Sequence, residues 1–114
     1  MANGNNNTVK GSKNILEGDR NKITGNQNSA AGDDNTIKGD KNFVNGDQNK
    51  VTGNNNGVSG SANQIGGSSN TVDGSQNKVK GDDNVLVGNL NQVNGGNNNI
   101  KGDENKLKGN NNQV

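Results

Sequence analysis

The apolar side chains of this chain fall in one column with a period of seven residues, and nearly everything between them is polar. Asparagine stands two positions before each member of the column and glycine five positions before, so the unit is G-x-x-N-x-(V/I/L)-x. Sixteen such units follow one another from Gly4 onward without an insertion. The column consists of Val9, Leu16, Ile23, Ala30, Ile37, Val44, Val51, Val58, Ile65, Val72, Val79, Leu86, Val93, Ile100, Leu107 and Val114. A strict short period is the sequence signature of a solenoid, in which each unit packs on its neighbours.

The period of seven does not indicate a coiled coil. A coiled coil needs two apolar positions in each heptad, and this repeat supplies one. Each glycine inside a helix would also cost about 1 kcal/mol relative to alanine. Valine and isoleucine favour strands, and the N-x-V-x segment alternates as a strand does. Asparagine and the aliphatic residue are therefore expected to point inward, and the two x positions outward.

These strands predict an all-β fold, a β-solenoid that occupies residues 1–114 as a single domain. Two units would form one coil of 14 residues, with two short strands and two turns, and the chain would form about eight coils of a two-sheet β-roll. At a strand spacing of about 4.8 Å, eight coils give a rod about 38 Å long. A triangular coil of three units is the competing geometry. We favour two units, because one aliphatic residue per strand suits a thin core between two sheets.

The invariant asparagine predicts hydrogen-bonded ladders inside the rod. An inward asparagine can bond from coil to coil through its amide and also reach the backbone of the turns. The residue after each column glycine is Asn, Asp or Ser in fifteen of the sixteen units, with Gly96 as the exception. We interpret this position as the one that bends the turn and adopts positive φ.

Composition narrows the range of functions. The chain has no cysteine or histidine, one aromatic residue and a net charge of +1. We therefore expect no disulfide, no cofactor and no metal site, and we read the aspartates after the turn glycines as turn residues and not as calcium ligands. No catalytic histidine, cysteine or tyrosine is present, so an enzyme is not expected. We also expect no nucleic acid or membrane partner, and no apolar run has the length of a signal peptide.

The outward x positions form two different faces. Alternate units starting at Gly4 build a lysine face: Thr8, Lys10, Lys22, Thr24, Thr36, Lys38, Lys50, Thr52, Gln64, Gly66, Lys78, Lys80, Gln92, Asn94, Lys106 and Lys108. The other units build a mixed face of small, hydroxyl and apolar residues: Ile15, Glu17, Ser29, Ala31, Phe43, Asn45, Gly57, Ser59, Thr71, Asp73, Val85, Val87, Asn99, Lys101 and Gln113.

Stretches such as Asn7-Thr8-Val9-Lys10-Gly11 and Ser69-Asn70-Thr71-Val72 make the chain similar to a known family. It resembles the grass ice-recrystallization-inhibition proteins, antifreeze β-rolls built from N-x-V-x-G repeats, over nearly its whole length. The resemblance implies a left-handed two-sheet β-roll, a flat face that adsorbs to ice, and an extracellular (apoplastic) location. This chain differs from the family in its many outward lysines and in a repeat that never departs from seven residues.

Ice binding would need a flat face of short side chains. Methyl groups limit competing hydration, hydroxyls anchor the ice lattice, and β-branched side chains lose little entropy. Long, hydrated lysines oppose this, so we place the site on the mixed face. Its candidate residues are Ser29, Ala31, Phe43, Asn45, Ser59, Thr71, Val85 and Val87. A second candidate strip on the lysine face is Thr8, Thr24, Thr36 and Thr52.

A structural filament is the alternative function. Solenoids usually cover their terminal coils with atypical capping units, and the first and last units here match the consensus. Exposed strand edges invite pairing, and sixteen units make a whole number of two-unit coils. The partners predicted from sequence are therefore an ice surface and, in the alternative, further copies of the same chain.

Overall fold

The computed structural model describes residues 1–114 as sixteen short strands, joined by turns and arranged in two eight-stranded sheets. One sheet contains, in spatial order, β1 (Ala2–Asn3), β3 (Ile15–Glu17), β5 (Ser29–Ala31), β7 (Phe43–Asn45), β9 (Gly57–Ser59), β11 (Thr71–Asp73), β13 (Val85–Val87) and β15 (Asn99–Lys101). The other contains β2 (Thr8–Lys10), β4 (Lys22–Thr24), β6 (Thr36–Lys38), β8 (Lys50–Thr52), β10 (Gln64–Gly66), β12 (Lys78–Lys80), β14 (Gln92–Asn94) and β16 (Lys106–Lys108).

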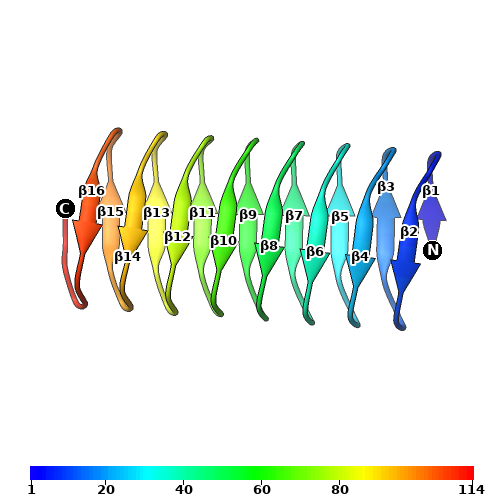
Figure 1. The fold of residues 1–114 in the computed structure, drawn as a ribbon, viewed down its shortest axis with the longest axis horizontal. Helices are drawn as coiled ribbons and strands as arrows, with labels where there is room; N and C mark the ends of the chain where they lie inside the picture. The colour runs from blue at the N-terminus through cyan, green and yellow to red at the C-terminus, as the bar shows by residue number, and fades with distance from the viewer.

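The chain winds as a β-solenoid with two units to each coil, which confirms the 14-residue geometry and rules out the triangular one. Each strand pairs in parallel with the strand 14 residues later, so that Val51 lies opposite Ile65 and Ile65 opposite Val79. The coils stack side by side along one axis, as Figure 1 shows. The rod measures 39 × 20 × 13 Å, close to the length expected from eight strand spacings. None of its elements is a helix with the length and apolarity needed to cross a membrane.

Two details at the ends of the repeat differ from the prediction. A short strand, β1, lies before the first unit, and Ala2 pairs with Leu16. At the other end the sixteenth unit contributes only an isolated bridge between Asn99 and Gln113. Within the units, each strand covers three residues and begins after the asparagine, which belongs to the corner of the coil.

The core is a single layer of the aliphatic column between the two sheets. Its thirteen members from Leu16 to Ile100 are at most 2% exposed. Burying an aliphatic side chain of this size contributes about 1.5–3 kcal/mol. At the ends the same column is open: Leu107 is partly buried, Val9 is 38% exposed and Val114 is 51% exposed. The interior is therefore uniform except at the terminal coils.

The predicted asparagine ladders are present at both edges of the core. Asn56 shows the pattern: its Nδ2 donates to Oδ1 of Asn42 at 3.0 Å and to the carbonyl oxygen of Gly67 at 2.9 Å. Its own Oδ1 accepts from the backbone N and the Nδ2 of Asn70, at 3.0 and 3.1 Å. Both amide donors and both oxygen lone pairs are thus used. No buried side-chain polar atom in the chain lacks a partner.

This geometry explains why the column is always asparagine. Serine has no NH₂ group with which to reach both the next asparagine and the turn carbonyl, and glutamine is longer by one methylene. An aspartate would bury a charge and lose both donors. Buried polar groups need hydrogen-bond partners. The side chain at this position must therefore make the bonds to both neighbouring coils and to the turn carbonyl.

The column glycine is required by the stacking of the coils. At Gly53 the backbone has φ 129°, and a Cβ would lie 1.8 Å from the carbonyl oxygen of Gly67 in the next coil. An L-residue is strained at such φ, and the contact distance leaves no room for any side chain. The glycine column thus lets successive turns approach closely enough for the asparagine Nδ2 to reach the glycine carbonyl.

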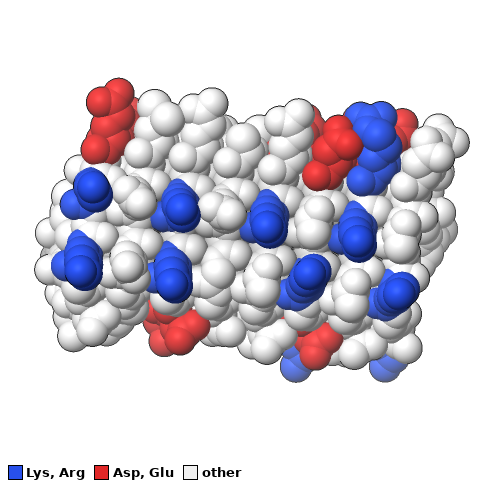
Figure 2. Space-filling view, in the orientation of Figure 1, with Lys and Arg blue, Asp and Glu red and all other residues white.

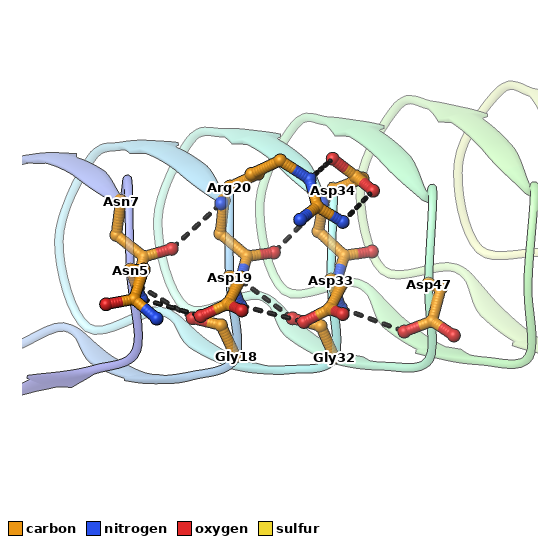
Figure 3. A network of polar contacts seen from close by, with 11 residues as sticks. Asn5, Asn7, Gly18, Asp19, Arg20, Gly32, Asp33, Asp34 and Asp47 are labelled. Carbon is orange, nitrogen blue, oxygen red and sulfur yellow. Dashed lines mark hydrogen bonds and ion pairs between the residues drawn. The ribbon is translucent and has the colours of Figure 1, made fainter.

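The prediction that the first residue after each column glycine adopts positive φ was wrong. The residues other than glycine that adopt positive φ are the second ones after each glycine, such as Lys13, Ala62 and Leu90, all near 58–59°. The first residue, which is Asn, Asp or Ser, forms an outer ladder. The backbone N of Asp19 donates to Oδ1 of Asp33 at 2.7 Å, and that of Asp33 donates to Oδ1 of Asp47 at 2.8 Å (Figure 3).

Candidate functional site

The mixed face is the outward surface of the sheet that contains β3 to β15. Its side chains lie in two columns, because each strand presents its first and third residues outward. The structure brings all eight candidate residues onto this one surface. Ser29, Phe43, Thr71 and Val85 lie in one column, and Ala31, Asn45, Ser59 and Val87 lie in the other.

The two columns differ in charge. The first column carries no ionisable side chain from Ile15 to Asn99. In the second column Asp73 lies between Ser59 and Val87. The charged carboxylate therefore interrupts the second column near its middle, whereas the first column is uncharged along its whole length.

All the large apolar side chains that point outward from the strands lie on the mixed face. Outward Ile15, Phe43, Val85 and Val87 are all exposed, and Phe43 is 55% exposed. No outward position of the lysine face carries a large apolar side chain. Ile15 was not among the predicted site residues, although its place on the mixed face and its apolar character were both visible in the sequence.

The second candidate strip does not form a run of threonines. Thr36 lies between Lys22 and Lys50 in one column, and Thr24 lies between Lys10 and Lys38 in the other. Thr8 and Thr52 likewise have a lysine as the neighbouring side chain of their column. Each threonine of this strip is therefore next to a long, hydrated cation.

Figure 2 shows the lysine face, with its lysines in two rows and acidic residues toward the edges of the rod. Eight of the twelve basic residues lie here, and no acidic side chain points outward from this sheet. Two flat surfaces of opposite character thus share one interior.

The ion pair of the chain lies at a turn and belongs to neither face. Nε and Nη2 of Arg20 donate to the two carboxylate oxygens of Asp34 at 2.7 and 2.8 Å (Figure 3). The hydrogen bonds raise the pKa of the Arg20 guanidinium further above its ordinary range and lower the pKa of the Asp34 carboxyl. Because both groups are exposed, the pair contributes little to stability.

Fold and faces together define a β-solenoid of the β-roll type, with planar outer surfaces. A family model of the grass antifreeze β-roll matches residues 1–95, and the chain belongs to that family. The residues after 95 continue the same repeat. The comparison with curated proteins gives no match.

Membership of this family confirms the resemblance seen in the sequence. The family is one of ice-binding proteins and is not a family of enzymes. Ice binding is thus associated with this chain at the level of the family. A shared fold does not identify the residues that contact ice, so the binding surface has to be inferred from the side chains of each face.

Proposed function

We propose that this protein binds ice through the mixed face and inhibits ice recrystallization. The observation that carries the proposal is a flat, eight-stranded surface of mainly hydroxyl, small and apolar side chains in a member of the grass antifreeze β-roll family. Parallel pairing fixes the spacing of these side chains to that of the strands, about 4.8 Å along the rod. Such a surface can order water in a repeating layer without a conformational change.

The uncharged column is the centre of the proposed site. It contains Ser29, Phe43, Thr71 and Val85 among the predicted residues, and we add Ile15 to it. The second column lies beside the uncharged column and contributes Ala31, Asn45, Ser59 and Val87 to the proposed site. The interior supports this function because asparagine ladders bond each coil to the next, and a preorganised surface loses little entropy on binding.

Grain growth in a frozen sucrose solution tests the activity. At micromolar protein we expect crystals that stay small during annealing, while crystals in buffer alone coarsen. Coarsening equal to that of the buffer control would remove the proposal. The extracellular location proposed with it is tested by following the tagged chain in intact tissue.

A matched pair of variants assigns the face. Thr71→Lys places a lysine in the uncharged column, and Thr52→Lys places one on the lysine face beside a lysine already present. We expect Thr71→Lys to lose most of the inhibition and Thr52→Lys to keep it. The reverse result would move the site to the strip of Thr8, Thr24, Thr36 and Thr52.

End-to-end association of rods is the second candidate. It is favoured by the exposure of the aliphatic column in the terminal coils, at Val9 and Val114. Negative-stain electron microscopy of concentrated protein would show filaments if the rods stack. A monodisperse species of 11.7 kDa in sedimentation at the same concentration would exclude this candidate.

A further inference from the structure

The lysine face gathers eight lysines that form no ion pair within the chain. The protein has almost no net charge, yet eight lysines lie on one flat surface without an acidic neighbour in the sheet. None of them takes part in an ion pair, since the one ion pair of the chain joins Arg20 to Asp34. A surface on which positive charges are concentrated attracts polyanions even when the net charge of the protein is close to zero.

The lysines are spaced in a regular way along the rod. In one column Lys22, Lys50, Lys78 and Lys106 occupy every second strand of the sheet, β4, β8, β12 and β16. Two strand spacings separate the Cα atoms of neighbouring lysines in this column by about 9.6 Å. No two lysines are direct neighbours within a column, which limits their mutual repulsion. A linear polymer with evenly spaced anionic groups matches such a row.

A depression interrupts this face at Gly66. It has a volume of about 280 Å³ and is lined by Ile65 and Val79 of the core column together with Lys50, Lys78, Lys80, Thr52 and Gln64. Gly66 does not have positive φ, and a Cβ there would meet only one atom, at 4.0 Å. The backbone therefore does not require glycine at this position. A missing side chain between three cations leaves a recess into which an anionic group can enter.

The polar residues between the lysines indicate the kind of polymer. Threonine hydroxyls and the amides of Gln64, Gln92 and Asn94 can bond to hydroxyl groups. The lysine face has no aromatic side chain on which bases could stack, as binding of single-stranded nucleic acid commonly uses. It also offers no large outward apolar side chain to enter a lipid layer.

We propose that the lysine face binds a linear acidic polysaccharide, with carboxylates on the lysine rows and one anionic group in the depression at Gly66. This partner lies on the side of the rod opposite the proposed ice-binding face, so both can be bound at once. The proposal does not depend on ice binding, and each can fail without the other.

The test is binding of a fluorescent linear oligogalacturonate of defined length, measured by anisotropy at low and at physiological salt. Neutral dextran, a single-stranded RNA of similar charge and anionic lipid vesicles serve as comparison ligands. We expect saturable binding of the oligogalacturonate that weakens with salt, because bound counterions are released. Binding of RNA or vesicles that is as tight or tighter would overturn the assignment to a polysaccharide.

Two triple variants with the same change in charge separate the face from the whole molecule. Lys50→Gln/Lys78→Gln/Lys80→Gln removes the rim of the depression, whereas Lys13→Gln/Lys41→Gln/Lys101→Gln removes three lysines that lie elsewhere. We expect the first to weaken binding by about tenfold or more and the second by less than about twofold. Equal losses in the two variants would contradict a specific surface.

A matched pair of glycine variants tests the depression itself. Gly66→Thr fills it, and Gly57→Thr makes the same change on the mixed face, where a Cβ meets nothing within 4 Å. Glycine weakens strands, so both variants are expected to raise the melting temperature. Only Gly66→Thr should weaken oligogalacturonate binding. A more stable Gly66→Thr protein with unchanged binding would show that the depression takes no part.

Discussion

The lysine face and the mixed face are built on one interior but differ in what they present to solvent. In β8 and in β11 alike, the central valine is buried between the sheets and the two flanking side chains point outward. These flanking residues are Lys50 and Thr52 in one case and Thr71 and Asp73 in the other. The interior thus determines shape alone, and the outward residues decide what each flat surface can bind.

The most damaging change to the shared interior is expected at a column glycine. Gly53→Ala would place a Cβ 1.8 Å from the carbonyl oxygen of Gly67, so the turn must move. We expect this movement to break the bonds from Asn42 Nδ2 to the Gly53 carbonyl and from Asn56 Nδ2 to the Gly67 carbonyl. We expect a loss of about 4 kcal/mol or more in thermal or urea unfolding. Gly57→Ala is the control, since the space around Gly57 is open. A small loss at Gly53 would mean that the coils are not in tight contact.

Loss of one ladder rung is expected to rank second. Asn56→Leu leaves the carbonyl oxygen of Gly67 and the backbone N of Asn70 buried without a hydrogen bond. It also removes one of the two bonds made by Asn42 Oδ1 and one of the two made by Asn70 Nδ2. A cost of about 3 kcal/mol follows from several unsatisfied groups. Lys50→Ala, an outward change in the adjacent strand, should stay within about 0.5 kcal/mol. Melting shifts of equal size would argue against the structural role of the ladder.

The columns of this interior could be predicted from the sequence because stacking gives equivalent positions of successive coils nearly the same environment. Val51 lies between Ile37 and Ile65, and Asn56 lies between Asn42 and Asn70, so the same kind of residue recurs every 14 residues. The position with positive φ left no such signal. Ala62 and Leu90 keep that conformation because their backbone N–H groups donate to carbonyl oxygens of the preceding coil, not because of their side chains.

The candidate site was only partly predictable, because its two columns differ through single residues. The sequence placed Thr71 and Asp73 on one face, but pairing in register was needed to show that Asp73 separates Ser59 from Val87. The depression at Gly66 was not predicted at all. A glycine outside the repeat column resembles an ordinary surface substitution until its φ and its neighbours are known.

Removing the charge from the second column should sharpen the contrast between the faces. Asp73→Thr makes both columns of the mixed face uncharged around the centre of the rod. We expect stronger inhibition of recrystallization at equal protein concentration, with a gain smaller than the loss caused by Thr71→Lys. Asp40→Asn, which removes one carboxylate at a turn, controls for net charge and should have no effect. A weaker Asp73→Thr protein would place Asp73 in the binding surface.

A stabilising change is expected at a turn that belongs to neither face. Leu90 is exposed and has φ 59°, a conformation that asparagine tolerates better than leucine. Leu90→Asn should raise the free energy of unfolding by about 0.5–1 kcal/mol without a change in either binding activity. A neutral or destabilising result would show that backbone bonds between coils have removed the usual preference.

The smallest effect is expected from the Arg20–Asp34 pair. The pKa of Asp34 is lower in the folded chain, so its contribution to stability is present above the ordinary carboxyl pKa and is lost as pH falls through the lowered value. The difference in melting temperature between the wild type and Asp34→Asn should therefore shrink toward strongly acidic pH. A difference that grows as pH falls would contradict this sign.

Contact of the mixed face, and not of the lysine face, with ice can be measured by partition of the protein into slowly growing ice. Labelled wild type, Thr71→Lys and Thr52→Lys are frozen under identical conditions, and the protein in the ice fraction is measured. We expect wild type and Thr52→Lys to enter the ice and Thr71→Lys to stay in the liquid. Exclusion of Thr52→Lys together with uptake of Thr71→Lys would contradict it.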